Sequence, residues 1–171
     1  MMELEKTSIE GVFLVRSAPA EDERGSFARL YCAEKMAGFT PRQTSLSQNP
    51  KAGTLRGMHF QKGAAAEKKL VTCLRGKIFD VALDLRPASP TYKKWFGAEL
   101  AAGRGLLIPQ GCAHGFLTLE DNAEVLYQIE GFYDAAAASG VRFNDPAFSI
   151  SWPRAPLLLS VRDGEWPDYA G

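Results

Sequence analysis

The side chains best suited to chemistry in this chain are its two histidines, each of which lies in a dense polar motif. His59 lies in Leu55-Arg56-Gly57-Met58-His59-Phe60-Gln61, and His114 lies in Ile108-Pro109-Gln110-Gly111-Cys112-Ala113-His114-Gly115-Phe116. Histidine is the side chain best suited to proton transfer near neutral pH. Either histidine alone could equally be a structural residue of the core, but two of them with a neighbouring arginine favour acid–base chemistry.

The second motif resembles the Pro-x-Gly-x-x-His half of the cupin signature, which contributes a metal ligand in many proteins. A metal would need further ligands, usually a His-x-His pair with a carboxylate from the other half. The corresponding pair here reads His59-Phe60-Gln61, so Gln61 stands where a second imidazole is required. Because the chain has no third histidine and no suitable cysteine pair, we expect a site that works without a bound metal.

Further motifs follow one another along nearly the whole chain. They are Asp22-Glu23-Arg24-Gly25-Ser26-Phe27, the two histidine motifs, Lys68-Lys69-Leu70-Val71, the stretch from Phe79 to Tyr92, and Asn144-Asp145-Pro146 with Trp152-Pro153. In this order, over roughly residues 10 to 165, they resemble the dTDP-4-dehydrorhamnose 3,5-epimerase family. The resemblance implies a cupin-like double-stranded β-helix, or jelly roll, that forms a homodimer. It also implies an isomerase that binds a nucleotide-linked 4-keto-6-deoxy sugar and inverts C3, C5 or both without a cofactor.

The resemblance assigns the reaction to four residues. It implies that His59 is the base, that Tyr127 is the acid and that Asp163 orients the base. Lys69, ten residues after His59, would steady the enolate. These roles agree with the chemistry, because a proton beside a ketone becomes removable only if the enolate oxygen is stabilised, and one such donor contributes about 3 to 4 kcal/mol. A base and an acid on opposite faces are each worth about 10²- to 10⁴-fold.

The resemblance also implies residues that bind the substrate. Phosphate and sugar contacts fall on Arg24, Gln43, Arg56 and His114, the aromatic that closes over the sugar or base is Tyr133, and Phe27 lies beside the nucleobase. Plainer interpretations exist: Tyr127 could be a packing residue of a strand, Asp163 a loop residue, Arg24 an exposed turn residue, and one of Lys68 and Lys69 a solvated surface charge.

The chain departs from the family pattern at three positions that concern binding. Arg29 replaces a carboxylate, Gln43-Thr44-Ser45 replaces Gln-x-Asn, and Glu67 replaces the glutamine that often precedes the lysine by two residues. These changes leave the nucleotide (dTDP, CDP or GDP) and the sugar more open than the reaction type. Three alternatives remain: a sugar-nucleotide ketoisomerase on the same scaffold, a non-catalytic cupin-like binding module, and a metal-dependent cupin. The presence of both His59 and Tyr127 favours epimerisation.

The elements that position these residues are predicted to be short strands. Apolar or alternating runs bounded by turn residues indicate an all-β sandwich or barrel with one domain spanning residues 1–171, and they cover residues 11–15, 70–74, 78–85, 106–108, 115–119 and 124–129. Helix is predicted only as a turn or two at residues 33–37 and 134–139. The tail from Asn144 is too rich in proline for continuous secondary structure and is expected to wrap the barrel.

Composition excludes several classes of function. Twenty basic and twenty acidic residues leave no net charge, so we expect neither nucleic-acid nor membrane binding. The charged start and the absence of a membrane-length apolar run predict a cytoplasmic protein. Cys32, Cys73 and Cys112 are widely spaced and are predicted to be reduced core thiols. An edge strand at residues 11–15 would favour a homodimer.

Overall fold

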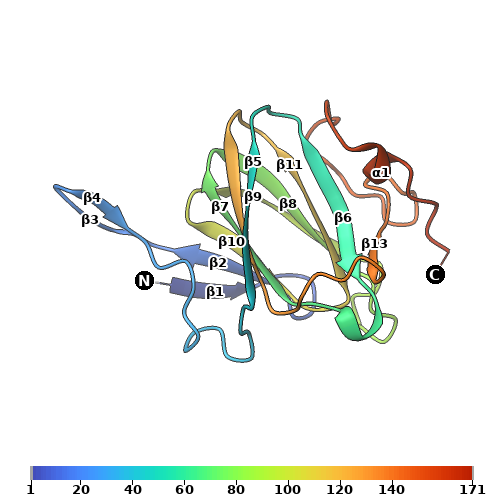
Figure 1. The fold of residues 1–171 in the computed structure, drawn as a ribbon, viewed down its shortest axis with the longest axis horizontal. Helices are drawn as coiled ribbons and strands as arrows, with labels where there is room; N and C mark the ends of the chain where they lie inside the picture. Colours follow the sequence, from blue (N-terminus) through green and yellow to red (C-terminus); the bar gives the residue numbers. More distant parts are fainter. Residues whose placement is uncertain (1, 171) are drawn as a thin grey trace.

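The computed structural model describes residues 2–170, which form mostly β-strands (Figure 1). Two short helical elements lie in this range, the 3-10 helix η1 (Gly63–Ala65) and the helix α1 (Val161–Gly164). The strands are β1 (Met2–Lys6), β2 (Phe13–Ser17), β3 (Ala20–Asp22), β4 (Gly25–Phe27), β5 (Gln43–Asn49), β6 (Leu55–Gln61), β7 (Lys69–Arg75), β8 (Lys77–Asp84), β9 (Trp95–Ala101), β10 (Arg104–Ile108), β11 (Cys112–Thr118), β12 (Ala123–Ile129) and β13 (Ala138–Gly140).

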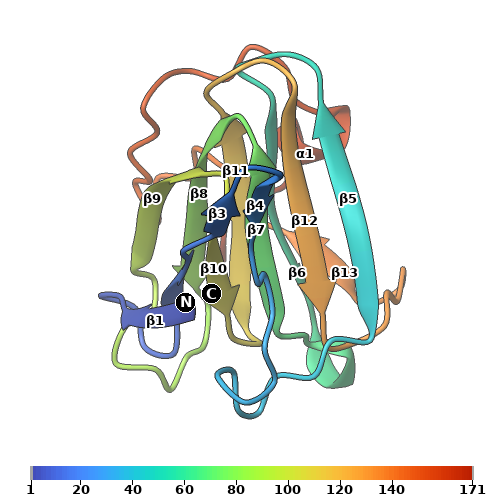
Figure 2. The same cartoon turned by 90° about the vertical axis from the view of Figure 1, so that its left-hand side faces the viewer.

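The strands form two antiparallel sheets that pack face to face (Figures 1 and 2). The six-stranded sheet has the order β1-β2-β10-β7-β12-β5, and the five-stranded sheet has the order β13-β6-β11-β8-β9. Strands β3 and β4 form a separate hairpin that projects away from both sheets (Figure 1). This architecture confirms the predicted all-β jelly roll with little helix.

The core between the sheets is built by the alternation of side chains along each strand. On β8, for example, Ile78 and Ala82 face the other sheet, while Val81 and Leu83 face outward. Both sheets contribute aliphatic side chains and cysteines to this core. Every residue of β11 is buried, because this central strand is covered on both of its faces.

The two ends of the chain cover the outer faces of the sheets, on opposite sides of the molecule (Figure 1). Met36 and Phe39, from the segment after the hairpin, pack on the outer face of the six-stranded sheet. Phe148, Ile150 and Trp152 of the tail pack on the outer face of the five-stranded sheet. The prediction that the proline-rich tail wraps the barrel is therefore confirmed.

The predicted strands are largely correct, but the predicted edge strand is wrong. The runs from residue 70 to residue 129 lie in β7, β8, β10, β11 and β12. The run at residues 11–15 becomes β2, which begins at Phe13 and is paired on both sides, with β1 and with β10. The edge at this end of the sheet is β1, where Met2 and Leu4 alternate with glutamates, a pattern too short and too charged to stand out in the sequence.

The predicted helical turns are also partly wrong. Residues 33–37 form turns rather than a helix, and the Cys32 carbonyl accepts hydrogen bonds from the N–H groups of Lys35 and Met36. In the alanine-rich run 134–139, Ala138 and Ser139 belong to β13 and pair with β6. Helix propensity is a weak preference, and pairing with an open sheet edge overrides it here.

The cysteines are free thiols, as predicted. Cys73 and Cys112 are buried and Cys32 is partly buried. Burial is the largest cause that raises the pKa of Cys73 to about 11 and that of Cys112 to about 12, so both thiols stay protonated at neutral pH. Within residues 2–170 no helix is long and apolar enough to cross a membrane.

The turn between β8 and β9 is anchored by the fully buried carboxylate of Asp84. It accepts hydrogen bonds from Nε and Nη2 of Arg86, from Oγ of Ser89 at 2.5 Å and from Oγ1 of Thr91 at 2.7 Å. Burial alone would raise the pKa of Asp84, but these hydrogen bonds outweigh it and hold the pKa well below its ordinary value. The charged carboxylate thus stabilises the fold at neutral pH, and this contribution is lost as the pH falls below about 4.

We predict that Asp84→Ala lowers the free energy of unfolding by about 3 to 5 kcal/mol, because it leaves a half-buried guanidinium without its partner. Chemical denaturation at pH 7 measures this loss. The matched control is Asp22→Ala, which removes an exposed aspartate paired with Arg24 and should cost about 1 kcal/mol or less. Equal losses in the two variants would contradict this interpretation.

Candidate active site

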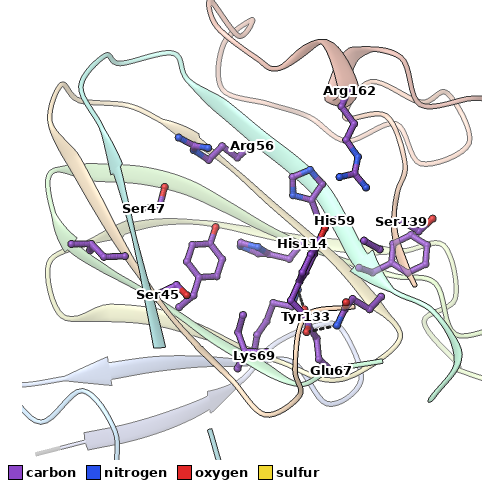
Figure 3. A pocket seen from close by; sticks show the side chains of 16 residues that line it. Ser45, Ser47, Arg56, His59, Glu67, Lys69, His114, Tyr133, Ser139 and Arg162 are labelled. Carbon is purple, nitrogen blue, oxygen red and sulfur yellow. Dashed lines mark hydrogen bonds and ion pairs between the residues drawn. The ribbon is translucent and has the colours of Figure 1, made fainter. Parts of the chain in front are cut away.

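A cavity of about 370 Å³ opens between the two sheets (Figure 3). Its walls come from β5, β7 and β12 of one sheet and from β6, β11 and β13 of the other, with α1 at one side. This volume lies within the range of about 300 to 1,000 Å³ that is usual for small-molecule sites. Six of the ten residues predicted for the site line the cavity: Arg56, His59, Lys69, His114, Tyr127 and Tyr133.

Strand alternation explains why residues distant in sequence meet here. Lys69 on β7 and Tyr127 on β12 continue the inward-facing rows that hold Val71 and Val125. His114 on β11 likewise lies in the inward-facing row and is paired across the sheet with His59 of β6. The proposed base, acid and enolate-binding group therefore face a common space.

His59 is held by Asp163 of α1. The Nε2 atom of His59 lies 2.6 Å from Oδ1 of Asp163, whose other oxygen accepts a hydrogen bond from the Gly57 N–H at 3.2 Å. Ser160 caps α1 through a hydrogen bond from the Asp163 N–H to its hydroxyl. Burial alone would raise the pKa of Asp163, but the hydrogen bonds, above all that of His59, lower it. An ionised Asp163 accepts a hydrogen bond from Nε2–H of His59, and this leaves the other ring nitrogen free to act as a base.

Tyr127 has the protonation state that an acid requires. It lies on the cavity wall and is partly buried. Burial, as the largest cause, and the nearby carboxylate of Asp80 raise the pKa of Tyr127, against a smaller opposite effect of Arg56. The phenol therefore stays protonated at neutral pH and can donate.

His114 is more deeply buried than His59 and is engaged by another carboxylate. Its Nε2 atom lies 2.7 Å from Oδ1 of Asp80, and neither side chain is more than 4% exposed. The imidazole packs edge-on against the ring of Tyr127, with the ring centres 5.7 Å apart. His114 thus lines the cavity and also packs against the ring of Tyr127.

The structure distinguishes the two neighbouring lysines. Lys69 is 6% exposed and its Nζ atom lies 3.0 Å from Oε1 of Glu67 inside the cavity. Lys68 points the other way, where its ammonium donates to the Gly38 carbonyl at 2.5 Å. Lys69 is therefore the lysine that faces the site, whereas Lys68 is a partly exposed surface charge.

Two arginines lie beside His59 at the cavity wall (Figure 3). Arg56 donates from Nε to Oδ1 of the buried Asn49 at 2.9 Å. Arg162 stacks over the ring of Trp166, with its guanidinium carbon 5.0 Å from the ring centre. Both arginines and His59 also line an adjoining cavity of about 410 Å³ beside α1. The two guanidinium groups suit an anionic ligand such as a phosphate.

The remaining predicted residues lie at the rim or outside the cavity. Tyr133 is 65% exposed and lines the cavity. Gln43 does not line it, but its side chain donates to the Gly131 carbonyl and so ties β5 to the segment that carries Tyr133. Arg24 and Phe27 lie on the projecting β3–β4 hairpin, where Phe27 is 77% exposed. The structure does not bring these two residues to the cavity of the same chain.

Sequence reasoning missed several residues of the cavity wall. A period-two reading of the first histidine motif would have found Gln61, which lies two residues after His59 on the same strand. Arg162 is adjacent to Asp163, but nothing in its neighbourhood indicated which way it points. Ser45, Ser47 and Ser139 also line the cavity, and no signal in the sequence marked them.

The side chains that could bind a metal ion are dispersed in the described part of the chain. Among residues 2–170, no group of three or more His, Cys, Asp or Glu side chains lies close enough together to hold a metal ion. Each histidine is hydrogen-bonded to a different carboxylate. Activity without a bound metal stays a prediction.

Known proteins resemble this chain along nearly its whole length. The family model described as dTDP-4-dehydrorhamnose 3,5-epimerase matches residues 6–170. A protein of that name from Salmonella typhimurium is 39% identical, over 98% of this chain and 95% of its own.

Two solved structures are similar along nearly the whole chain. The Bacillus anthracis dTDP-4-dehydrorhamnose 3,5-epimerase, with TDP and PPi bound, has a TM-score of 0.92 and 38% identity, covering 99% of this chain and 100% of that one. A Legionella pneumophila 3,5-epimerase in complex with dTDP-4-keto-L-rhamnose has a TM-score of 0.87 and 33% identity, covering 95% and 90%. The chain belongs to the dTDP-4-dehydrorhamnose 3,5-epimerase family.

Proposed function

We propose that this protein is an isomerase that inverts C3, C5 or both of a nucleotide-linked 4-keto-6-deoxy hexose. The substrate we propose is dTDP-4-dehydro-6-deoxyglucose, and the product is dTDP-4-dehydrorhamnose. One observation carries the proposal: a carboxylate-bound imidazole, a protonated phenol and a buried ammonium group all face one cavity. The names of the relatives support the choice of substrate.

The proposed reaction needs no group beyond these side chains. His59 removes a proton from the carbon beside the C4 ketone, and the electron pair of the C–H bond moves onto the ketone oxygen as an enolate. Lys69 stabilises the enolate oxygen through its ammonium group. Tyr127 then returns a proton to the opposite face of the same carbon. One proton is removed and one is added, so the product is an isomer of the substrate.

The anionic end of the substrate is matched by the two arginines. We place the diphosphate beside Arg56 and Arg162, which both the main and the adjoining cavity share. The Bacillus anthracis relative was solved with TDP and PPi bound, which supports a diphosphate ligand. The absence of net charge on the whole chain makes such local arginines necessary.

We also propose a homodimer in which the β3–β4 hairpin reaches the partner. All six strand residues of this hairpin are exposed, and Phe27 at its end is a large apolar side chain without cover. Because the strands of this hairpin bury no residue against the rest of their own chain, we propose that the hairpin packs on the partner instead. Arg24 and Phe27 would then serve the partner's nucleotide site. Light scattering at micromolar concentration should give twice the chain mass, whereas a monomer would contradict this proposal.

We predict that activity survives prolonged chelation, because the two histidines lack the further ligands that a His-rich metal site requires. The measurement is turnover after dialysis against a chelator, together with elemental analysis of the purified protein. One zinc, iron or nickel per chain, with activity lost on its removal, would show that this prediction is wrong.

Two other functions would use the same scaffold. A ketoisomerase would also move protons beside a carbonyl, and a binding module would hold the nucleotide sugar unchanged. Incubation with dTDP-4-dehydro-6-deoxyglucose, followed by identification of the product, separates the three. We further propose that residues 1–171 act as one domain in the cytoplasm, without nucleic acid or membrane partners; the continuous core between the sheets and the balanced charge support this.

A further inference from the structure

A carboxylate that the proposed reaction does not use lies inside the cavity. Oε1 of Glu67 is 3.0 Å from Nζ of Lys69, and the two side chains are only 10% and 7% exposed. A nearly buried carboxylate is costly unless it is paired and hydrogen-bonded, and it repels an anionic substrate. Glu67 therefore requires a role that outweighs these costs.

The second oxygen of Glu67 is fixed by Gln61. Gln61 Nε2 donates to Oε2 of Glu67 at 2.8 Å and also to the carbonyls of Ala65 and Phe132. Its Oε1 accepts the N–H of Asp134 at 2.7 Å. Because backbone groups set both ends of the Gln61 amide, the amide orientation is fixed. The Glu67 carboxylate is thus held at one oxygen and pairs with the lysine at the other.

We infer that Glu67 is a positioning residue that holds the ammonium group of Lys69 where the enolate oxygen forms. This inference rests on the proposed function. A lysine side chain is a flexible four-carbon stem, and stabilisation of an enolate depends on a donor that is in place before the reaction. Side chains two residues apart in extended chain point to the same side, so Glu67 and Lys69 reach the cavity together. Glu67 acts through Lys69 and has no contact of its own with the reacting atoms.

The test is a double-mutant cycle between Glu67 and Lys69. Glu67→Ala should lower kcat by about 10- to 100-fold, because a displaced catalytic group costs up to about 10²-fold, with KM changed by less than about threefold. In a Lys69→Met background the same Glu67→Ala change should cause no further loss, since no ammonium group is left to position. Lys68→Met is the matched control and should keep the wild-type rate, because Lys68 points away from the cavity.

Three results would overturn the inference. They are an unchanged kcat in Glu67→Ala, a loss of the same size in the Lys69→Met background, and a rise in KM without a fall in kcat. If Glu67→Ala does not fold, Glu67→Gln replaces it in both backgrounds. This variant keeps the side-chain length and one acceptor oxygen, so its loss should be smaller but should again disappear without Lys69. A wild-type protein that does not convert the substrate would instead overturn the proposed function.

Discussion

His59→Ala is expected to abolish both deuterium exchange from solvent and epimerisation. His59 is the proposed base, and its ring is oriented by the ionised Asp163 at 2.6 Å. Without a base no carbon-bound proton is removed, no enolate forms, and neither outcome can follow. Since a positioned base is worth about 10²- to 10⁴-fold, both rates should fall by at least about 10²-fold together.

The measurement is proton NMR of dTDP-4-dehydro-6-deoxyglucose in D₂O with the variant. Lys62→Ala is a suitable control, because Lys62 is an exposed residue that directly follows β6 and does not line the cavity. Exchange at the wild-type rate in His59→Ala would assign the base to another group. His114 would then be the first candidate, although Asp80 holds its Nε2 atom.

Tyr127→Phe is expected to separate exchange from inversion. This change keeps the aromatic bulk against His114 and removes only the proton donor. The enolate should still form and should be reprotonated by His59 on its original face. Inversion should therefore fall by about 10²-fold or more, while exchange should fall by less than about tenfold.

Tyr31→Phe is the matched control for this variant. It also removes a tyrosine hydroxyl with a hydrogen bond, here to the Phe39 carbonyl, but it lies outside the cavity. We expect it to epimerise at the wild-type rate. If Tyr127→Phe did so too, the acid would be another group, and Tyr133, which also lines the cavity, would be the first candidate.

The sequence was sufficient to predict much of the fold, because alternation and turn residues mark the central strands clearly. Strands β7, β8 and β10 to β12 were found for this reason. Strand β6 was identified as a motif but not as a strand, since Gly57 interrupts its alternation of apolar and polar residues. Strand β13 was missed because Ala138 ends a run of four alanines that favours helix, and only the open edge of β6 makes this segment a strand.

The site also contains residues that the sequence was sufficient to predict and residues that it was not. Of the four residues proposed for the reaction, His59 and Lys69 fall within motifs and Tyr127 falls within a predicted strand, and the structure places these three on inward-facing strand positions. Asp163 comes from a short helix more than 100 residues away from His59 in the chain, and only the folding of the tail brings them together. Arg162 lies in the short helix α1, and no local pattern in the sequence indicated that its side chain would reach the cavity. Glu67 was noted only as a departure from the family pattern, although its spacing of two residues from Lys69 brings both side chains to the cavity.

The central claim is that the cavity removes and returns protons beside a ketone. The most direct test follows the wild-type protein and dTDP-4-dehydro-6-deoxyglucose in D₂O by proton NMR. The account predicts that deuterium enters at C3, at C5 or at both, and that dTDP-4-dehydrorhamnose or the single epimer appears. A substrate that keeps all its carbon-bound protons and its configuration, while bound to the protein, would contradict the account.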